Sequence, residues 1–313
     1  MKVAITGATG FVGGHLIDYL GSRGVEVIPF SRTAHLVRNV QCIVMNYSDS
    51  DMMQMQLQDV DVVVHLGGLA HKLDGLHSLN DYIEANVDST VALAKLSREV
   101  QVKRFIYVSS IAVNGGDTDG RGPFSEDDSP MPATLYGQSK LMAEDRIKSI
   151  FKDSSTDFVI LRPPLIYGSD CPGNFRELLM LSSYMRILPF GALSCVKSMI
   201  SVQNFVDAIF HSLQSSEAAN QVFIVSDSET LPINKMIDIL MTEFHGSKAI
   251  NLPLSPAILG ILAKIVGKQK QWLKFTSQLE VNSDKFCNMT NWSAPYTVRE
   301  GLRECVKGFL RNA

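Results

Sequence analysis

The first half of the chain alternates between two kinds of segment, and this alternation restricts the fold more than any other feature of the sequence. Short apolar runs predict buried strands, at residues 2–6, 25–30, 41–46, 60–66, 104–110 and 157–163. Stretches with apolar residues at helical spacing lie between them, at residues 10–24, at 79–100 and around Tyr136. Strands that are apolar on both faces and alternate with helices predict an α/β protein with a doubly wound parallel sheet.

The regular alternation ends after residue 168. A helix at 201–214 and a strand at 221–226 are predicted to return to the main sheet. We therefore expect a Rossmann-like dinucleotide-binding domain over residues 1–168, with 201–226 joined to it. The remaining segments, 169–200 and 227–313, are expected to form a smaller, mostly helical C-terminal lobe that binds the substrate.

One apolar stretch of the second part, "PAILGILAKIVG" at residues 256–267, has two interpretations. It is too short to span a bilayer, which needs about 20 apolar residues. We expect it to form a core helix. The alternative is a helix at a membrane interface, with Lys264 and Lys268 at the level of the headgroups.

Composition excludes several classes of protein. The 313 residues carry a net charge of −3 without a basic block, so no nucleic-acid partner is expected. The start, "MKVAIT", leads directly into a strand without a secretory pattern, which favours a cytoplasmic location without a transmembrane segment. Five scattered cysteines predict free thiols. His65, His71 and His77 have no carboxylate cluster beside them, so no metal site is expected.

A glycine-rich turn follows the first strand and opens the first helix. In "TGATGFVGG", Gly7 permits a tight turn, Gly10 lets the backbone approach a pyrophosphate, and Gly13 lets helix and strand pack closely. Backbone amides near Phe11 and Val12 would then face the phosphates at a helix N-terminus. The position of the turn predicts a dinucleotide site, although a purely structural glycine turn is the alternative.

The end of the second strand bears on the choice of cofactor. A carboxylate there would bind the ribose of NAD, whereas a nearby arginine would bind the 2′-phosphate of NADP. The chain has Ser31 and Arg32, and no acid until Asp49. This favours NADP(H) and leaves NAD(H) possible, because Arg32 could also be a solvated loop residue.

Three side chains form a candidate catalytic group. Tyr136 and Lys140 are four residues apart and would share one face of a helix. A nearby ammonium is expected to lower the pKa of a phenol. Ser110 ends the fifth strand, where it could hold a carbonyl oxygen while Tyr136 acts as general acid.

Together these segments resemble the extended short-chain dehydrogenase/reductases, the NAD(P)-dependent sugar-nucleotide epimerase/dehydratase group. The resemblance covers essentially the whole chain and rests on "TGATGFVGG", "VVVHLGGLA", "EANVDSTVALA", "FIYVSSIAVNG", "YGQSKLMAE" and "VILRPPLIYG". It implies a Ser110–Tyr136–Lys140 triad. It also implies cofactor contacts from Leu66, Gly67, Gly68, Asn46 near the adenine, and Pro163 near the nicotinamide, with Asn86 near the site.

Departures from the family pattern narrow the implied activity. Dehydratases of this group carry Asp-Glu where this chain has Ile111 and Ala112, and many epimerases have Tyr at the position of Asn114. The motifs are most similar to bacterial reductases of nucleotide-linked 4-keto-6-deoxy-N-acetylhexosamines, which make UDP-N-acetylquinovosamine-type sugars for polysaccharides. This similarity implies substrate contacts from Ser110, Asn114, Asn174, Phe175 and Lys197, the last three near the diphosphate.

Three functional hypotheses follow. The first is an NAD(P)H-dependent reductase of a 4-ketosugar nucleotide, the second is an NAD-dependent sugar-nucleotide 4-epimerase, and the third is a dinucleotide-sensing protein without turnover. The resemblance also implies a homodimer formed through the helices around residues 86–100 and after Tyr136. Apolar surface for it would come from Val91, Leu93, Ala94, Leu141 and Ile147, unless these residues pack within one chain.

Overall fold

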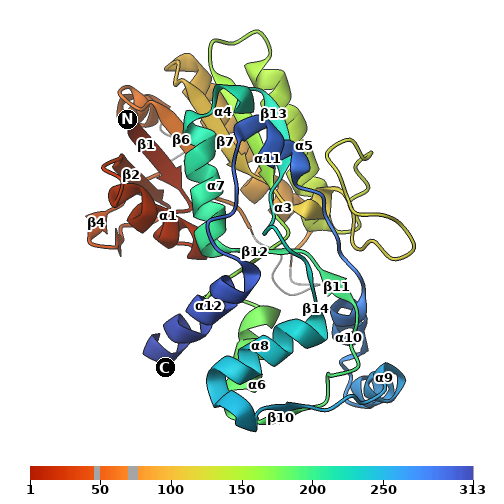
Figure 1. The fold of residues 1–313 in the computed structure, drawn as a ribbon. Coiled ribbons are helices and arrows are strands. Elements are labelled where there is room, and N and C mark those ends of the chain that lie inside the picture. Colours follow the sequence, from red (N-terminus) through yellow and green to blue (C-terminus); the bar gives the residue numbers. More distant parts are fainter. Residues whose placement is uncertain (46–49, 70–76, 313) are drawn as a thin grey trace.

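The computed structural model describes residues 1–45, 50–69 and 77–312, and its centre is a seven-stranded parallel sheet (Figure 1). The strand order is β13-β8-β7-β6-β1-β2-β5, so the order reverses beside β1. The strands are β1 (Lys2–Thr6), β2 (Glu26–Ser31), β5 (Ile43–Val44), β6 (Val62–His65), β7 (Arg104–Val108), β8 (Asp157–Arg162) and β13 (Gln221–Ile224). The expected α/β fold with a doubly wound sheet is confirmed.

Helices cover both faces of this sheet because its strands are apolar on both sides. Leu16 and Ile17 of α1 (Phe11–Gly21) pack with Phe205 of α7 (Val202–Gln214) against one face. Leu93 of α4 (Ser89–Glu99) and Ile147 of α5 (Leu135–Phe151) pack against the other, together with α2 (Ser50–Leu57). Both faces of the sheet are therefore covered by helices.

Two details differ from the expected elements. The single helix expected over 79–100 is divided into α3 (Leu79–Tyr82), a π-helical segment η1 (Ile83–Asp88) and α4. The strand expected over 41–46 is shortened to β5, because a small hairpin precedes it, formed by β3 (Leu36–Val37) and β4 (Val40–Gln41). Arg38 and Asn39 both have positive φ at its turn, the geometry that two-residue hairpins favour.

The C-terminal lobe lies below the sheet in Figure 1 and has its own apolar core. Helices α6 (Asn174–Tyr184), α8 (Ile233–His245) and α12 (Val298–Asn312) supply most of that core. Short strand pairs frame it: β9 (Leu165–Tyr167) with β12 (Met199–Ser201), β10 (Ile187–Leu188) with β15 (Ile250–Asn251), and β11 (Val196–Lys197) with β14 (Leu231–Pro232). Helix α11 (Asp284–Thr290) instead returns to β13, where Phe286 packs on Phe223. Short helical turns are η2 (Ile111–Val113), η3 (Ser216–Ala218) and η4 (Gly246–Lys248).

The apolar stretch 256–267 forms α9 (Pro256–Ile265), followed by α10 (Gln269–Thr276). The expectation of a core helix is wrong, because Leu259 is the only buried residue of α9. The helix contacts α10, and its other large aliphatic side chains are exposed to solvent. Across the described ranges, no helix combines the length and apolarity needed to cross a membrane.

Candidate active site

The candidate site lies where β1, β6, β7 and β8 reach their carboxyl ends. At Gly7 the backbone has φ of 69°, and a Cβ atom there would lie 2.8 Å from the backbone of Leu66 and Gly67. Glycine is therefore required by both the dihedral angle and the close approach of two strand ends. The structure thus brings the glycine turn together with the segment after β6, two of the regions expected to bind a cofactor.

The first turn of α1 has the properties of an anion site. Its N-cap is Gly10, and no side chain caps the helix, so the first amides remain available. A Cβ atom at Gly13 would overlap the carbonyl oxygen of Gly7 and lie 2.8 Å from Cα of Ala8. The turn and helix are packed as a dinucleotide-binding turn requires, and the uncapped amides near Phe11 and Val12 suit a pyrophosphate.

The candidate catalytic side chains meet because α5 begins against the end of β7. Thr134 caps α5 by accepting a hydrogen bond from the amide of Gly137, at 3.1 Å. A Cβ atom at Gly137 would lie 3.0 Å from the carbonyl carbon of Ala112, so only glycine lets the helix start this close to η2. As a result, the phenol of Tyr136 forms a hydrogen bond with the Ser110 hydroxyl.

Burial dominates the ionisation of this group. The pKa of Tyr136 is raised to about 12 by desolvation, although the Ser110 hydrogen bond lowers it. The expected lowering of the Tyr136 pKa by Lys140 is therefore not what the structure shows. The ammonium lies 5.9 Å from the Tyr136 ring centroid and donates instead to the Val108 carbonyl, at 3.0 Å. Desolvation also lowers the pKa of Lys140 to about 8.

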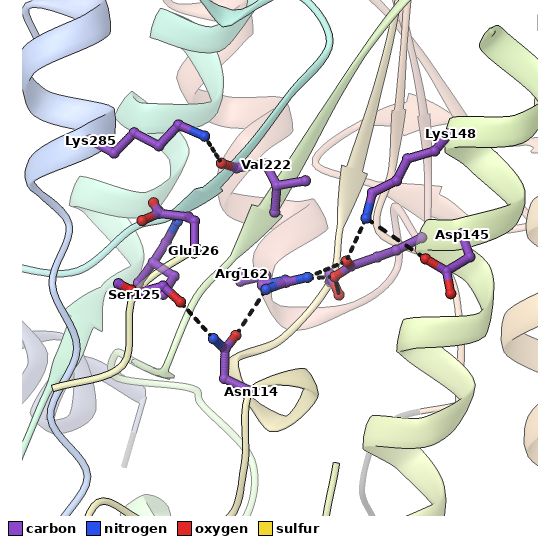
Figure 2. Close-up of polar contacts among 11 residues, drawn as sticks. Asn114, Ser125, Glu126, Asp145, Lys148, Arg162, Val222 and Lys285 are labelled. Atoms are coloured by element: carbon purple, nitrogen blue, oxygen red, sulfur yellow. Dashed lines mark hydrogen bonds and ion pairs between the residues drawn. The ribbon is translucent and has the colours of Figure 1, made fainter. Parts of the chain in front are cut away.

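A buried polar network supports these residues from beneath. The carboxylate of Glu144 accepts hydrogen bonds from Ser109 at 2.6 Å and from Arg162 at 2.9 and 2.6 Å. Asn114 connects Arg162 to the Ser125 carbonyl, at 3.1 and 2.8 Å (Figure 2). Our sequence analysis missed this network. The spacing of Glu144 could have indicated its place, since it follows Lys140 by one helical turn and Tyr136 by two and so lies on the same side of the helix.

Asn86 orders the segment that follows β6. Its side chain accepts from the amide of Leu69 at 2.6 Å and donates to the Ser139 hydroxyl at 2.9 Å. A Cβ atom at Gly68 would lie 2.6 Å from the same amide oxygen. Asn86 lies within the π-helical segment η1, a geometry found often at functional sites. The amide therefore links the predicted cofactor loop to the helix that carries Tyr136 and Lys140.

His65 is a core residue at the end of β6. Its two ring nitrogens bond the hydroxyls of Thr6 at 2.5 Å and Thr90 at 2.9 Å. Burial lowers the pKa of His65 to about 3, so the ring is neutral. His65 therefore supports the packing of the core. His71 and the predicted cofactor residue Asn46 lie outside the described residues.

The end of β2 places the two residues expected to select the cofactor in different environments. Ser31 is buried and its hydroxyl donates to the carbonyl of Thr33, whereas Arg32 is exposed. A second guanidinium, from Arg38 in the β3–β4 hairpin, lies over α1 and pairs with Asp18 at 3.1 Å. Sequence analysis did not identify Arg38, because a hairpin of this length has no clear periodic signal.

The residues implied to contact the substrate differ in their burial and in their hydrogen bonds within the protein. Asn114 is buried, and both ends of its amide are used within the protein. Phe175 is also buried, 5.5 Å from the Tyr167 ring, while Asn174 is exposed at the start of α6. Lys197 is half-buried and donates to the Lys274 carbonyl at 3.1 Å and to the Ser277 hydroxyl at 3.0 Å. Of these four residues, only Asn174 and Lys197 therefore have a polar group near the surface.

Pro163 and three of the residues expected at a dimer interface make packing contacts within the chain. Pro163 is buried after β8, and its carbonyl accepts from the amide of Ile111 at 3.0 Å, which joins the ends of β7 and β8. Leu93, Ala94 and Ile147, expected to supply dimer surface, are fully buried within the chain. They pack against the sheet, so only Val91 and Leu141 of the five keep partial exposure.

Comparison with known proteins agrees with this arrangement. The model of the NAD dependent epimerase/dehydratase family matches residues 3–226. UDP-glucose 4-epimerase of Vibrio cholerae is 33% identical over 316 residues, which cover 99% of this chain and 96% of that protein. N-acetyl-alpha-D-glucosaminyl-diphospho-ditrans,octacis-undecaprenol 4-epimerase of Escherichia coli O157:H7 is 27% identical, with coverage of 96% and 93%.

A solved structure gives the same fold. UDP-glucuronic acid 4-epimerase from Bacillus cereus, in complex with NAD, superposes with a TM-score of 0.78 at 21% identity, over 100% of this chain and 99% of that one. The sheet order, the glycine turn and the match over most of the length point the same way. The chain belongs to the NAD dependent epimerase/dehydratase family.

Proposed function

We propose that this protein reduces a nucleotide-linked 4-keto-6-deoxy sugar with NAD(P)H and gives a UDP-N-acetylquinovosamine-type product. The observation that carries the proposal is the hydrogen bond between Ser110 and Tyr136, with the Lys140 ammonium behind them. Ser110 follows β7 and the glycine turn follows β1, so both lie at the carboxyl ends of strands in the parallel sheet. A hydroxyl, a phenol and a cation at these strand ends are the groups needed to polarise a sugar ketone.

The chain's own residues have distinct tasks in this reaction. A nicotinamide cofactor would supply the hydride, and Tyr136 would donate a proton to the sugar oxygen. A pKa of about 12 keeps the phenol protonated and ready to act as an acid. Ser110 would hold the same oxygen. Lys140, fixed on the Val108 carbonyl, would hold positive charge beside the developing phenolate.

The residues after Ser110 argue against dehydration as the reaction. Elimination of water from a sugar needs an acid and a base close to the catalytic hydroxyl. Ile111 and Ala112 occupy those positions, and Ile111 is buried in an apolar cluster with Phe124 and Ile224. Ketone reduction needs a proton donor at one oxygen and a hydride from the cofactor, and it does not need an acid and a base at positions 111 and 112.

We propose NADP(H) as the preferred cofactor, carried by the exposed Arg32 at the end of β2. No carboxylate follows at the end of β2 until Asp49, and a guanidinium can meet a 2′-phosphate with paired hydrogen bonds. We also propose that Asn174 and Lys197 contact the substrate diphosphate. The two residues come from α6 and β11, which belong to the lobe.

The second candidate is a sugar-nucleotide 4-epimerase. The names of the two relatives from Vibrio cholerae and Escherichia coli support it, since both are 4-epimerases of a sugar on a diphosphate. The same Ser110, Tyr136 and Lys140 would serve that reaction. The difference lies in the cofactor, because an epimerase regenerates a retained NAD, whereas a reductase must release its oxidised cofactor.

The test is incubation of the purified protein with UDP-4-keto-6-deoxy-N-acetylglucosamine and NADPH, followed by absorbance at the nicotinamide band and product identification by NMR. The proposal expects stoichiometric oxidation of NADPH and a 4-hydroxy product. A parallel reaction contains UDP-glucose or UDP-N-acetylglucosamine without added cofactor. Epimerisation there, without ketosugar reduction, would establish the second candidate. Cofactor binding without either reaction would favour a sensing role.

A further inference from the structure

Helices α9 and α10 form a hairpin at the periphery of the lobe, away from the main sheet (Figure 1). We call the solvent-facing side of this hairpin its outer face. Six aliphatic side chains on it are between 52% and 74% exposed. They are Ile258, Ile261, Leu262, Ile265, Val266 and Leu273. The four from Ile258 to Ile265 fall on one side of α9, since residues three and four apart share a helix face.

The orientation of α9 is opposite to that of an ordinary surface helix, whose apolar side faces the core. The side that packs inward contains the small Gly260, where a Cβ atom would lie 2.9 Å from Nε1 of Trp272. Trp272 packs on Phe275, and Phe275 packs on Phe190 with ring centroids 5.8 Å apart. The hairpin is therefore already anchored to the lobe by small and aromatic residues, and the aliphatic outer face is left over.

The charged side chains in and around the hairpin are positive. Residues 244–279 contain no Asp or Glu, although the whole chain has a net charge of −3. The same segment contains five lysines, Lys248, Lys264, Lys268, Lys270 and Lys274, and the four on or between the two helices are exposed. Lysines that border an exposed aliphatic face give the pattern of a helix that lies in the headgroup region of an anionic membrane.

We propose that the outer face of the α9–α10 hairpin binds the surface of an anionic phospholipid bilayer. The aliphatic side chains would enter the boundary between headgroups and acyl chains, and the lysine ammonium groups would contact lipid phosphates. Helix α9 has 10 residues, about 15 Å in length, so it lies on the bilayer and does not cross it. Binding of this kind is reversible and depends on salt, because the electrostatic part is screened.

The charge of the segment also argues against a second copy of this chain as the partner. A two-fold interface places the same surface patch on both subunits. Two outer faces in contact would bring two lysine-rich, acid-free segments together, and the like charges would repel. An anionic lipid surface covers the aliphatic residues and neutralises the lysines at the same time.

The experiment measures co-flotation of the full chain with vesicles of phosphatidylcholine containing about one third phosphatidylglycerol, and with vesicles of phosphatidylcholine alone. One variant, Ile261→Ser with Ile265→Ser, removes part of the outer face. Its matched control is Leu36→Ser, an exposed leucine in β3. A second variant, Lys264→Gln with Lys268→Gln and Lys270→Gln, removes charge, and Lys152→Gln, at the exposed residue that follows α5, is its control. Thermal unfolding verifies that each variant is folded.

The proposal expects wild type to bind the phosphatidylglycerol vesicles and to be released by 0.5 M salt, a concentration of roughly three times physiological strength. The serine variant should bind at least about tenfold more weakly, since each aliphatic side chain contributes apolar area. The glutamine variant should lose about a hundredfold, at roughly fivefold per lysine. Both controls should bind as wild type.

Three results would overturn the proposal. The first is wild type that stays in the dense fraction and does not float with the vesicles at low salt. The second is binding of the serine and glutamine variants that equals that of their controls. Self-association in sedimentation velocity that is lost in the serine variant, without vesicle binding by wild type, would instead assign the outer face to a second copy of the chain.

Discussion

The carboxylate of Glu144 on α5 accepts two hydrogen bonds from the guanidinium of Arg162 at the end of β8, at 2.9 and 2.6 Å, and both side chains are buried. This pair ties the helix that carries Tyr136 and Lys140 to the strand that leads into Pro163. Removal of one member of a buried ion pair leaves the other charge uncompensated.

We therefore expect Glu144→Gln to lower the free energy of unfolding by about 3 kcal/mol. The matched control is Asp145→Asn, because Asp145 is an exposed carboxylate on the same helix. Urea denaturation of both variants measures the difference. Equal stability of the two would mean that the Glu144–Arg162 pair contributes no more than a surface charge.

The reaction should depend on the protonation of Lys140. Burial lowers its pKa to about 8, from a usual value of 10.5, and the Glu144 carboxylate opposes this shift. We expect kcat/KM for ketone reduction, which reports the free enzyme, to fall as pH rises through about 8. Glu144→Gln should move this fall to lower pH. An unchanged profile in that variant would separate Glu144 from the ionisation of Lys140.

The same shift predicts a stability signature of known sign. Between pH 8 and 10.5 the unfolded chain binds a proton at Lys140 that the native state has lost. This group therefore makes the free energy of unfolding rise with pH in that window, since stability rises where the unfolded state binds more protons. Lys140→Met should remove this contribution, as measured by urea denaturation across the window.

Tyr136→Phe tests the proposed proton donor. The phenyl ring keeps the packing, including the edge contact with Tyr82 at 6.3 Å, but loses the hydroxyl that bonds Ser110. We expect turnover to fall by about 10²–10⁴, with cofactor affinity nearly unchanged. Tyr184→Phe, at an exposed tyrosine of α6, is the control. Near-full activity of Tyr136→Phe would remove this residue from the mechanism.

Arg32→Ala tests cofactor choice. Loss of a charge-assisted hydrogen bond of roughly 1.5–3 kcal/mol should weaken NADPH about ten- to a hundredfold and change NADH little. Ser31→Asp should go further, because a carboxylate repels a 2′-phosphate. Arg146→Ala, at an exposed arginine of α5, is the matched control. Equal weakening of both cofactors by Arg32→Ala would contradict the NADP(H) proposal and strengthen the epimerase candidate.

A pair of glycine variants in α1 tests the phosphate turn. A Cβ atom at Gly13 would overlap the Gly7 carbonyl, whereas one at Gly21 has nothing within 4 Å. Gly13→Ala should therefore cost about 1–3 kcal/mol of stability and weaken both nicotinamide cofactors. Gly21→Ala should be neutral or stabilising by up to about 1 kcal/mol. Titration calorimetry measures cofactor affinity, and thermal unfolding measures stability. Equal behaviour of the two variants would argue against the close packing at Gly13.

The sequence by itself determined the parallel α/β fold and pointed to the cofactor turn and to Ser110, Tyr136 and Lys140. These signals are local, since strand and helix periods, the glycine spacing and the four-residue interval are all written within short segments. Segment boundaries were less well predicted. The helix expected over 79–100 is interrupted by the π-helical segment around Asn86, which depends on contacts with Leu69 and Ser139.

Only the tertiary structure decided the contacts, the burial and the pKa values of those residues. Ser110 and Tyr136 meet because Gly137 packs on η2, and Glu144 pairs with Arg162 across 18 residues of sequence. Burial, which no local pattern encodes, raises the pKa of Tyr136 and lowers that of Lys140. The same reason explains α9, since a helical period shows that a helix has an apolar side but not whether protein or solvent lies against it.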